Sequence, residues 1–164
     1  MTLEYAKMIM QWNFEDKQKN IPINERTKIK VVFFSPGGDL EVNNCLVDTI
    51  SLSQTPVVGI NVGMAASSGC FIYLACHERY TFPTAEFLLH KGAGQFSGSY
   101  NDVVAAIFNY QRQIDELGKF VLSRTNIPED TFYENFENDW YLSAKEATEY
   151  KVADRIITSL DEII

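Results

Sequence analysis

The stretch Val62-Gly63-Met64-Ala65-Ala66-Ser67-Ser68-Gly69-Cys70 joins two apolar segments through small residues and two serines. Residues 56–62 are typical of a buried strand, and residues 71–76 continue as an apolar helix. A hydroxyl at such a turn lies at a helix N-terminus, where unpaired backbone N–H groups favour negative charge. The turn fits a nucleophilic serine beside an oxyanion hole. It also fits an ordinary helix N-cap, which the stretch alone favours.

The composition is that of a globular protein. The chain has 164 residues, 46% of them hydrophobic and 22% charged, which is enough for one domain with a sizeable core. Its net charge is −8 and its Lys and Arg residues form no block, so nucleic acid is not an expected partner. No CxxC pair or Cys/His cluster suggests a metal site, and we expect no cofactor.

The cysteines and the apolar runs bear on the compartment. Cys45, Cys70 and Cys76 are odd in number and lie in apolar or small-residue segments, so we interpret them as reduced core residues of a cytoplasmic protein. The N-terminus lacks the basic region and long apolar run of a signal peptide. No apolar stretch approaches the length of about 18 residues that a membrane span needs, so no membrane association is expected.

Strands and helices alternate along the chain. Strands are expected over 29–34, 56–62, 78–82, 86–90 and 152–157, with a short extended piece near 140, and helices over 2–15, 39–53, 68–77, 100–125, 127–136 and from 143. The alternation between 29 and 90 predicts βαβ units, and hence an α/β fold with a mostly parallel sheet covered by helices. No repeat or linker divides the chain, so residues 1–164 are predicted to form one domain.

The longest predicted helix, 100–125, carries apolar residues in alternating steps of four and three. These are Val103, Ile107, Tyr110, Ile114, Leu117 and Val121. Such a seam is typical of a helix that packs along a partner helix. A helix with a second apolar face can bury one face in its own domain and the other against a neighbouring subunit, but an ordinary core helix fits the pattern as well.

Only two histidines are available for acid–base chemistry. His77 is predicted at the C-terminal end of a helix, where the helix dipole favours a protonated imidazole, and this is a sufficient structural reason for it. His90 ends a strand at the mouth of the glycine-rich segment 91–99, and sites in open α/β sheets form at strand ends. His90 is therefore the better general base. Asp139 is a reasonable orienting group, although the sequence alone cannot select it among 22 acids.

Several motifs together resemble the ClpP family, the proteolytic subunits of Clp proteases. In chain order they are Ser35-Pro36-Gly37-Gly38, Gly63 to Gly69, Leu88-Leu89-His90, Asp139, Leu142-Ser143-Ala144 and Glu146-Ala147, joined by Thr125, Pro128 and Glu149-Tyr150. The resemblance covers about residues 29–158 without large gaps. One motif alone would be weak, whereas their common order and spacing are specific.

The resemblance assigns roles to individual residues. Ser67 is similar to the family's nucleophile, His90 to its general base and Asp139 to the group that orients the base. The backbone N–H groups of Gly38 and Ser68 correspond to the oxyanion hole. This agrees with the residue-level argument, in which one donor follows the nucleophile at a helix start and the other comes from a glycine.

The resemblance also implies a fold and an assembly. It implies the ClpP/crotonase-type fold, with a head of about 1–90 and 126–164 and a protruding handle helix within about 91–125. Peptide substrates would bind as an added strand between Asp39-Leu40 and Gly92-Ala93. Members form heptameric rings that stack as a tetradecamer and work with a Clp-type ATPase that unfolds proteins. The helix 2–15 would belong to the ring-forming head.

Some positions depart from the family pattern. Ser68 stands where Met is usual, and Lys91-Gly92 stand where Gln-Pro are usual. Glu137 keeps an acid of a ring-linking acid–Arg pair, but Asn138 replaces the Arg and cannot form its charge-assisted bond. Typical members also carry an axial loop and a first strand before the helix expected at 2–15, so docking of an ATPase lacks support from this chain.

Three functions remain open from the sequence. The first is a serine endopeptidase subunit that works inside an oligomeric chamber. The second is a non-catalytic or regulatory ring subunit, against which the presence of Ser67, His90 and Asp139 argues. The third is a crotonase-type acyl-CoA enzyme, which would use oxyanion donors without these three side chains.

Overall fold

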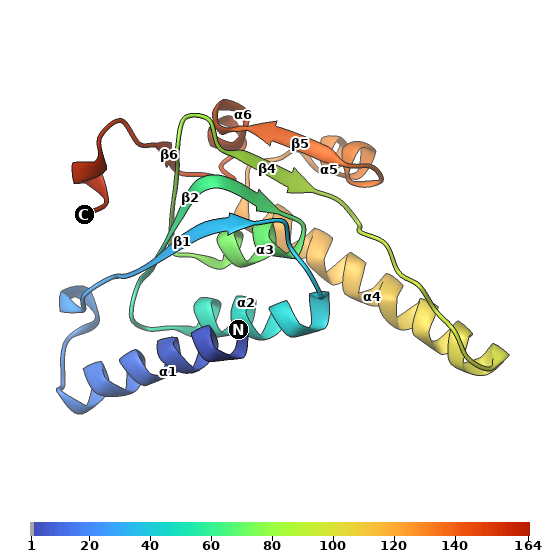
Figure 1. Cartoon of the computed structure of the whole chain (residues 1–164), viewed down its shortest axis with the longest axis horizontal. Coiled ribbons are helices and arrows are strands. Elements are labelled where there is room, and N and C mark those ends of the chain that lie inside the picture. Colours follow the sequence, from blue (N-terminus) through green and yellow to red (C-terminus); the bar gives the residue numbers. More distant parts are fainter. Residues whose placement is uncertain (1) are drawn as a thin grey trace.

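A central sheet organises the computed structural model, which describes residues 2–164 (Figure 1). Its strands are β1 (Ile29–Ser35), β2 (Val57–Ala66), β3 (Glu78–Thr81), β4 (Glu86–Leu89), β5 (Trp140–Ser143) and β6 (Arg155–Ile156). The helices are α1 (Thr2–Gln18), α2 (Leu40–Leu52), α3 (Ser68–Ala75), α4 (Tyr100–Arg124), α5 (Glu129–Phe136) and α6 (Ala144–Glu149), with 3-10 turns at Ile23–Glu25 and Leu160–Glu162. The predicted α/β class is confirmed.

Strand β2 is the axis of the sheet. The order is β5-β4-β2-β3-β6, and β1 also pairs with β2. All pairings are parallel except β4 with β5. The first half of β2 lies between β1 and β3, whereas Met64–Ala66 pair with β4. The expected strand 56–62 therefore continues to Ala66, because the small residues after Val62 extend the ladder, and the turn is confined to Ser67.

The helices that follow β1 and β2 cover one side of the sheet. Figure 1 shows α1, α2 and α3 stacked on the same side of β1 and β2. Helix α3 is buried along its whole length. Its Tyr73 ring packs edge-on against Phe33 of β1, with ring centroids 5.3 Å apart, and at a tilt against Phe87 of β4, with ring centroids 5.2 Å apart. The apolar core thus holds fixed the helix whose first residue follows Ser67.

Helix α4 projects from the body of the molecule (Figure 1). Its C-terminal half is anchored, since Ile114, Leu117 and Val121 are buried. Its N-terminal half is open, and Ile107 and Phe108 are exposed. The seam predicted from the sequence is therefore filled within the chain only toward its C-terminal end, and the protruding helix of the predicted fold is present.

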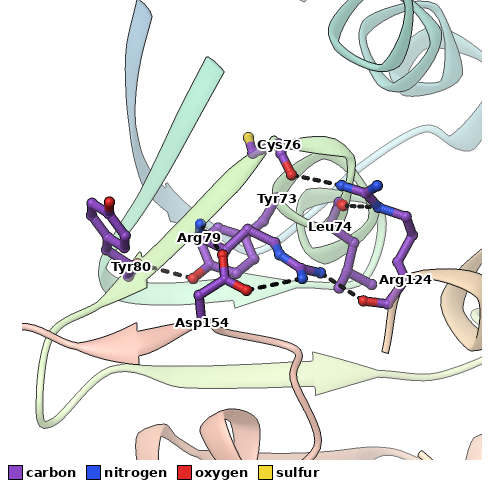
Figure 2. Close-up of polar contacts among 7 residues, drawn as sticks. All are labelled: Tyr73, Leu74, Cys76, Arg79, Tyr80, Arg124 and Asp154. Carbon is purple, nitrogen blue, oxygen red and sulfur yellow. Dashed lines mark hydrogen bonds and ion pairs between the residues drawn. The ribbon is translucent and has the colours of Figure 1, made fainter. Parts of the chain in front are cut away.

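Two arginines hold the end of α4, one of them by bonding to the end of α3 (Figure 2). The Arg124 guanidinium donates to the carbonyl groups of Leu74, at 2.9 Å, and Cys76, at 2.7 Å, where α3 ends. Arg79 of β3 donates to the Arg124 carbonyl at 2.9 Å and to Asp154 Oδ1 at 3.2 Å. Because the last carbonyls of a helix lack partners within it, Arg124 acts as a side-chain cap for α3.

Several expectations about single residues were wrong. Cys45, expected in the core, is exposed on α2, where its thiol donates to the Val42 carbonyl. The last strand is only Arg155–Ile156, because Lys151 adopts a positive φ and Asp154 bonds to the Arg79 backbone N–H before pairing begins. No helix within residues 2–164 is long and apolar enough to cross a membrane.

Candidate active site

Ser67, His90 and Asp139 form one hydrogen-bonded row. The Ser67 Oγ lies 2.8 Å from His90 Nε2, and His90 Nδ1 lies 2.8 Å from Asp139 Oδ1. A carboxylate can only accept, so Nδ1 carries the proton and Nε2 is the acceptor for the serine hydroxyl. This is the arrangement in which an imidazole can take a proton from a nucleophile while a carboxylate holds it in the right tautomer.

The register of the sheet brings these residues together. Ala66 of β2 is paired with Leu88 of β4, and the Ser67 N–H donates to the Leu88 carbonyl at 2.9 Å. Leu89 is paired with Trp140 of the antiparallel strand β5. His90 and Asp139 are the next residues outward from that pair, so their side chains meet. Three segments that are far apart in sequence thus converge at one edge of the sheet.

The backbone at Ser67 is strained. Its φ is 55° and its ψ is −130°, a positive-φ conformation that few residues other than glycine adopt. Ser67 occupies the N-cap position of α3, but its side chain makes no capping hydrogen bond. The N-cap interpretation of the hydroxyl is therefore wrong. A strained strand-to-helix turn that exposes a hydroxyl is typical of nucleophile elbows.

Two glycines bring a second backbone close to Ser67. Gly37 has φ of 94°, and a Cβ there would lie 2.6 Å from Ser67 Cβ and 2.7 Å from the Ala66 carbonyl oxygen. Only glycine fits this contact. Within residues 2–164 the N–H groups of Gly38 and Ser68 have no hydrogen-bond acceptor, and both residues line the cavity beside Ser67. The Gly37-Gly38 motif had indicated a close approach of two backbone segments, but it had not shown that Gly37 makes the close contact and that, in the described part of the chain, Gly38 presents the free N–H.

A cavity of about 340 Å³ opens in front of the row. Its lining includes Asp39, Leu40, Gly92 and Ala93, as well as Ser67 and His90. The sequence did not assign its apolar floor, which is Phe71 with Tyr110, Ile114 and Leu117 of α4. The α4 residues belong to the predicted seam, so the signal for them was present but pointed to helix packing.

The chain after His90 is pinned to its surroundings. The Lys91 N–H donates to the Phe136 carbonyl at 3.2 Å, and the Lys91 ammonium forms an ion pair with Glu137. The Tyr110 hydroxyl of α4 donates to the Lys91 carbonyl at 2.8 Å. Lys91, which departs from the resemblance, thus joins the segment that carries His90 to the loop that carries Asp139.

His77 has a different role from the one expected. Its Nδ1 accepts a hydrogen bond from the Val57 N–H at 3.1 Å, which requires a neutral ring nitrogen. Burial, with the nearby Arg124 guanidinium, lowers the pKa of His77 below its ordinary value of 6.5. The prediction of a protonated His77 at a helix end is wrong, and the side chain serves as a hydrogen-bond acceptor. Within residues 2–164 no group of three or more His, Cys, Asp or Glu side chains is placed to hold a metal ion.

Comparison with known proteins shows the family to which the chain is similar. The model of the Clp protease family matches residues 19–160. "ATP-dependent Clp protease proteolytic subunit 3" of Rhizobium johnstonii is 31% identical over 137 residues, which cover 82% of this chain and 71% of that protein. The proteins of the same name from Rhizobium meliloti and Rhizobium etli are 31% and 30% identical over 137 residues, and the matches cover 70% and 71% of them.

Proposed function

The chain belongs to the Clp protease family, and from that premise we propose that it is a serine endopeptidase subunit. Family membership itself supports a proteolytic subunit. The serine mechanism is supported by one observation above all, the continuous row from Ser67 Oγ through His90 to Asp139 with 2.8 Å at each step. A hydroxyl, a base and an orienting acid within hydrogen-bond reach are what acyl transfer requires.

The proposed reaction proceeds through an acyl-enzyme. Ser67 Oγ attacks the scissile carbonyl carbon while His90 Nε2 takes its proton, and the oxyanion forms between the N–H groups of Gly38 and Ser68. The protonated His90 then gives its proton to the leaving amine as the C–N bond breaks. Water attacks the acyl-enzyme with His90 again as base, and the carboxylic acid product leaves Ser67 free. Asp139 holds the imidazole throughout.

The substrate we propose is an extended, unfolded polypeptide. Asp39, Leu40, Gly92 and Ala93 all line the cavity that holds Ser67 and His90. An extended peptide laid between them would add a strand and place its side chain over the apolar floor. We propose these four residues as the substrate-binding positions.

We propose that the subunit acts within an oligomer with a Clp-type ATPase. The relatives are by name proteolytic subunits of an ATP-dependent protease. We propose a head of about 1–90 and 126–164, a handle within 91–125, and heptameric rings that stack through the handle. The exposed apolar side chains on the projecting half of α4 support stacking. The free thiols of Cys45, Cys70 and Cys76 suit a reducing compartment, and we propose the cytoplasm.

Active-site labelling tests the proposal. A fluorophosphonate should react with the wild-type protein, and peptide mapping should place one adduct on Ser67. Ser67→Ala should give no adduct, and His90→Ala should give a greatly slowed reaction because no base remains. Circular dichroism is used to check that each variant is folded. A folded wild-type oligomer that takes no label and cleaves no fluorogenic peptide would contradict the proposal and favour a non-catalytic subunit.

A further inference from the structure

The side chain of Ser68 links both halves of the proposed oxyanion hole. Its backbone N–H is one of the two proposed donors, and its hydroxyl donates to the Gly38 carbonyl at 3.1 Å. The same hydroxyl oxygen accepts from Asn43 Nδ2 of α2 at 2.7 Å. Ser68 is 2% exposed, so water does not compete for these bonds. The hydroxyl thus ties the start of α3 to the loop that carries Gly38.

The direction of this hydrogen-bond chain is fixed by its last member. The Gly38 carbonyl can only accept, so the single hydroxyl proton of Ser68 must point to it. The Ser68 oxygen then has to accept from Asn43, which places the amide nitrogen toward Ser68 and the amide oxygen toward Thr2. The Thr2 hydroxyl lies 3.1 Å from that Asn43 oxygen and donates to it. The chain therefore runs from α1 through α2 to the glycine loop in one direction.

The tie matters because Gly38 has little stiffness of its own, whereas the neighbouring Gly37 N–H is held by Ser35 Oγ at 3.2 Å. Gly37 and Gly38 have φ values of 94° and 156°, and a Cβ on Gly38 would meet only Asn43 Nδ2, at 3.6 Å. Glycine has more backbone freedom than any other residue, so an unheld Gly38 would turn its N–H away from the cavity in part of the population. A hydrogen bond on the Gly38 carbonyl restricts rotation of the peptide unit that follows its Cα, and so reduces the conformational freedom of Gly38 as a whole.

We propose that Ser68, through its hydroxyl, and Asn43 are positioning residues that hold the Gly38 N–H in line with the Ser68 N–H. This inference rests on the proposed function and deepens it. It also explains the departure at position 68, because the Met usual in the family has no hydroxyl with which to hold the loop. The turnover rate of this chain would then depend on the hydrogen bond from Asn43 of α2, a residue that does not contact the reacting atoms.

The most specific variant is Asn43→Asp. Aspartate keeps the shape of the side chain and can still accept from Thr2, but it cannot donate to Ser68. The Ser68 hydroxyl would turn its proton to the carboxylate, and the Gly38 carbonyl would lose its donor. The matched control is Asn44→Asp, the same change one residue along α2, where the side chain makes none of these contacts. Ser68→Ala removes the hydroxyl directly, and Ser68→Thr restores it.

The readout separates a transition-state effect from a general loss of structure. We expect Asn43→Asp and Ser68→Ala to lower kcat for a fluorogenic peptide by about 10- to 30-fold, with KM unchanged. This is less than the fall in kcat of about 10²- to 10³-fold that follows the loss of a whole oxyanion donor. The inhibition constant of a peptide aldehyde, whose hemiacetal oxygen occupies the oxyanion hole, should rise by the same factor. The affinity for the product peptide should not change. Ser68→Thr should recover most of kcat, and Asn44→Asp should match the wild type.

The outcomes are distinguishable from failure of the proposed function. An active wild type with kcat and aldehyde affinity unchanged in both Asn43→Asp and Ser68→Ala would overturn this inference and leave the serine mechanism standing. Equal losses in aldehyde and product affinity would also overturn it, since they indicate a damaged cleft. A folded wild type without activity or fluorophosphonate labelling would overturn the proposed function and this inference with it.

Discussion

At the residue scale, Ser67 combines a strained backbone with the proposed role of nucleophile. Its positive φ is maintained by the surrounding sheet and by the buried helix that begins at the next residue. Residues with such backbone conformations cost on the order of 1–3 kcal/mol each, and they persist where the surrounding structure allows no other conformation. The position is therefore one at which stability and activity are expected to change in opposite directions.

Replacing Ser67 with glycine tests that opposition. Both Ser67→Gly and Ser67→Ala lose the hydroxyl, but only glycine relieves the strained φ. After allowance for the extra freedom of glycine in the unfolded chain, Ser67→Gly should be more stable than Ser67→Ala by about 1 kcal/mol. Urea unfolding of the two inactive variants measures the difference. An alanine variant as stable as the glycine variant would mean that the turn carries no strain.

His77 predicts a pH dependence of stability. The pKa of His77 is lowered in the folded protein, first by burial and then by Arg124, although hydrogen bonds with the backbone of Ser53 and Val57, and the charge of Glu78, act in the other direction. As the pH falls through 6.5, the unfolded chain takes up a proton at His77 before the folded protein does, so stability that is present above pH 6.5 is lost below it.

The matched variant is His77→Gln, whose amide oxygen can still accept from the Val57 N–H. The fall in unfolding free energy between pH 7 and pH 5 should be shallower in His77→Gln than in the wild type, as measured by urea titrations across that range. Parallel curves for the two proteins would contradict a lowered pKa at His77.

At this scale the sequence named Ser67, His90 and Asp139 as candidates, and the structure places them within hydrogen-bond reach of one another. Ser67, His90 and Asp139 were named through the resemblance, because a scattered serine, histidine and acid carry little information alone. The tie from Asn43 to Ser68 could not be foreseen, because it depends on the rotation of α2 about its axis. The neutral state of His77 was missed because α3 ends two residues earlier than the histidine.

At the element scale, α3 is fixed at both ends by other segments. Its first residue bonds through its side chain to the glycine loop, and its last carbonyls accept from Arg124 at the end of α4. Helix α3 thus connects the proposed oxyanion hole to the projecting helix. The long β2 was under-predicted because Gly63 and the alanines have low strand propensity, and pairing with β4 outweighs that preference.

Arg124 should contribute more to the free energy of unfolding than a surface arginine does. Arg124→Ala leaves the carbonyls of Leu74 and Cys76 without their donor, which should cost about 2 kcal/mol, since relief of repulsion from Arg79 offsets part of the loss. The control is Arg112→Ala on the exposed face of the same helix, which should change stability by less than about 0.5 kcal/mol. Equal effects of the two variants on urea unfolding would show that Arg124 does not cap α3.

At the scale of the whole molecule, the exposed apolar residues of α4 bear on assembly. The C-terminal half of the sequence seam is buried within the chain, while Tyr100, Ile107 and Phe108 on the projecting half are exposed. The sequence predicted a helix with spare apolar surface but not which half would be covered, because that depends on where the sheet ends. We attribute the uncovered half to the proposed contact between rings.

Phe108→Glu tests that contact. A buried charge at a ring interface is costly, so the variant should shift the assembly toward a complex of half the mass, while its thermal unfolding stays close to that of the wild type. Native mass spectrometry measures the change against multiples of the 18.7 kDa chain. Asn109→Glu adds the same charge to the next face of the helix and should leave the mass unchanged. A wild-type monomer, or an unchanged mass for Phe108→Glu, would contradict stacking through α4.

The most direct test of the central claim is a crystal structure of the wild-type protein with a peptide aldehyde. The account predicts a covalent bond from Ser67 Oγ to the aldehyde carbon, with the hemiacetal oxygen about 2.7–3.1 Å from the backbone nitrogens of Gly38 and Ser68. The peptide should lie between Asp39-Leu40 and Gly92-Ala93. An adduct on another residue, or a hemiacetal oxygen that points away from both nitrogens, would contradict it.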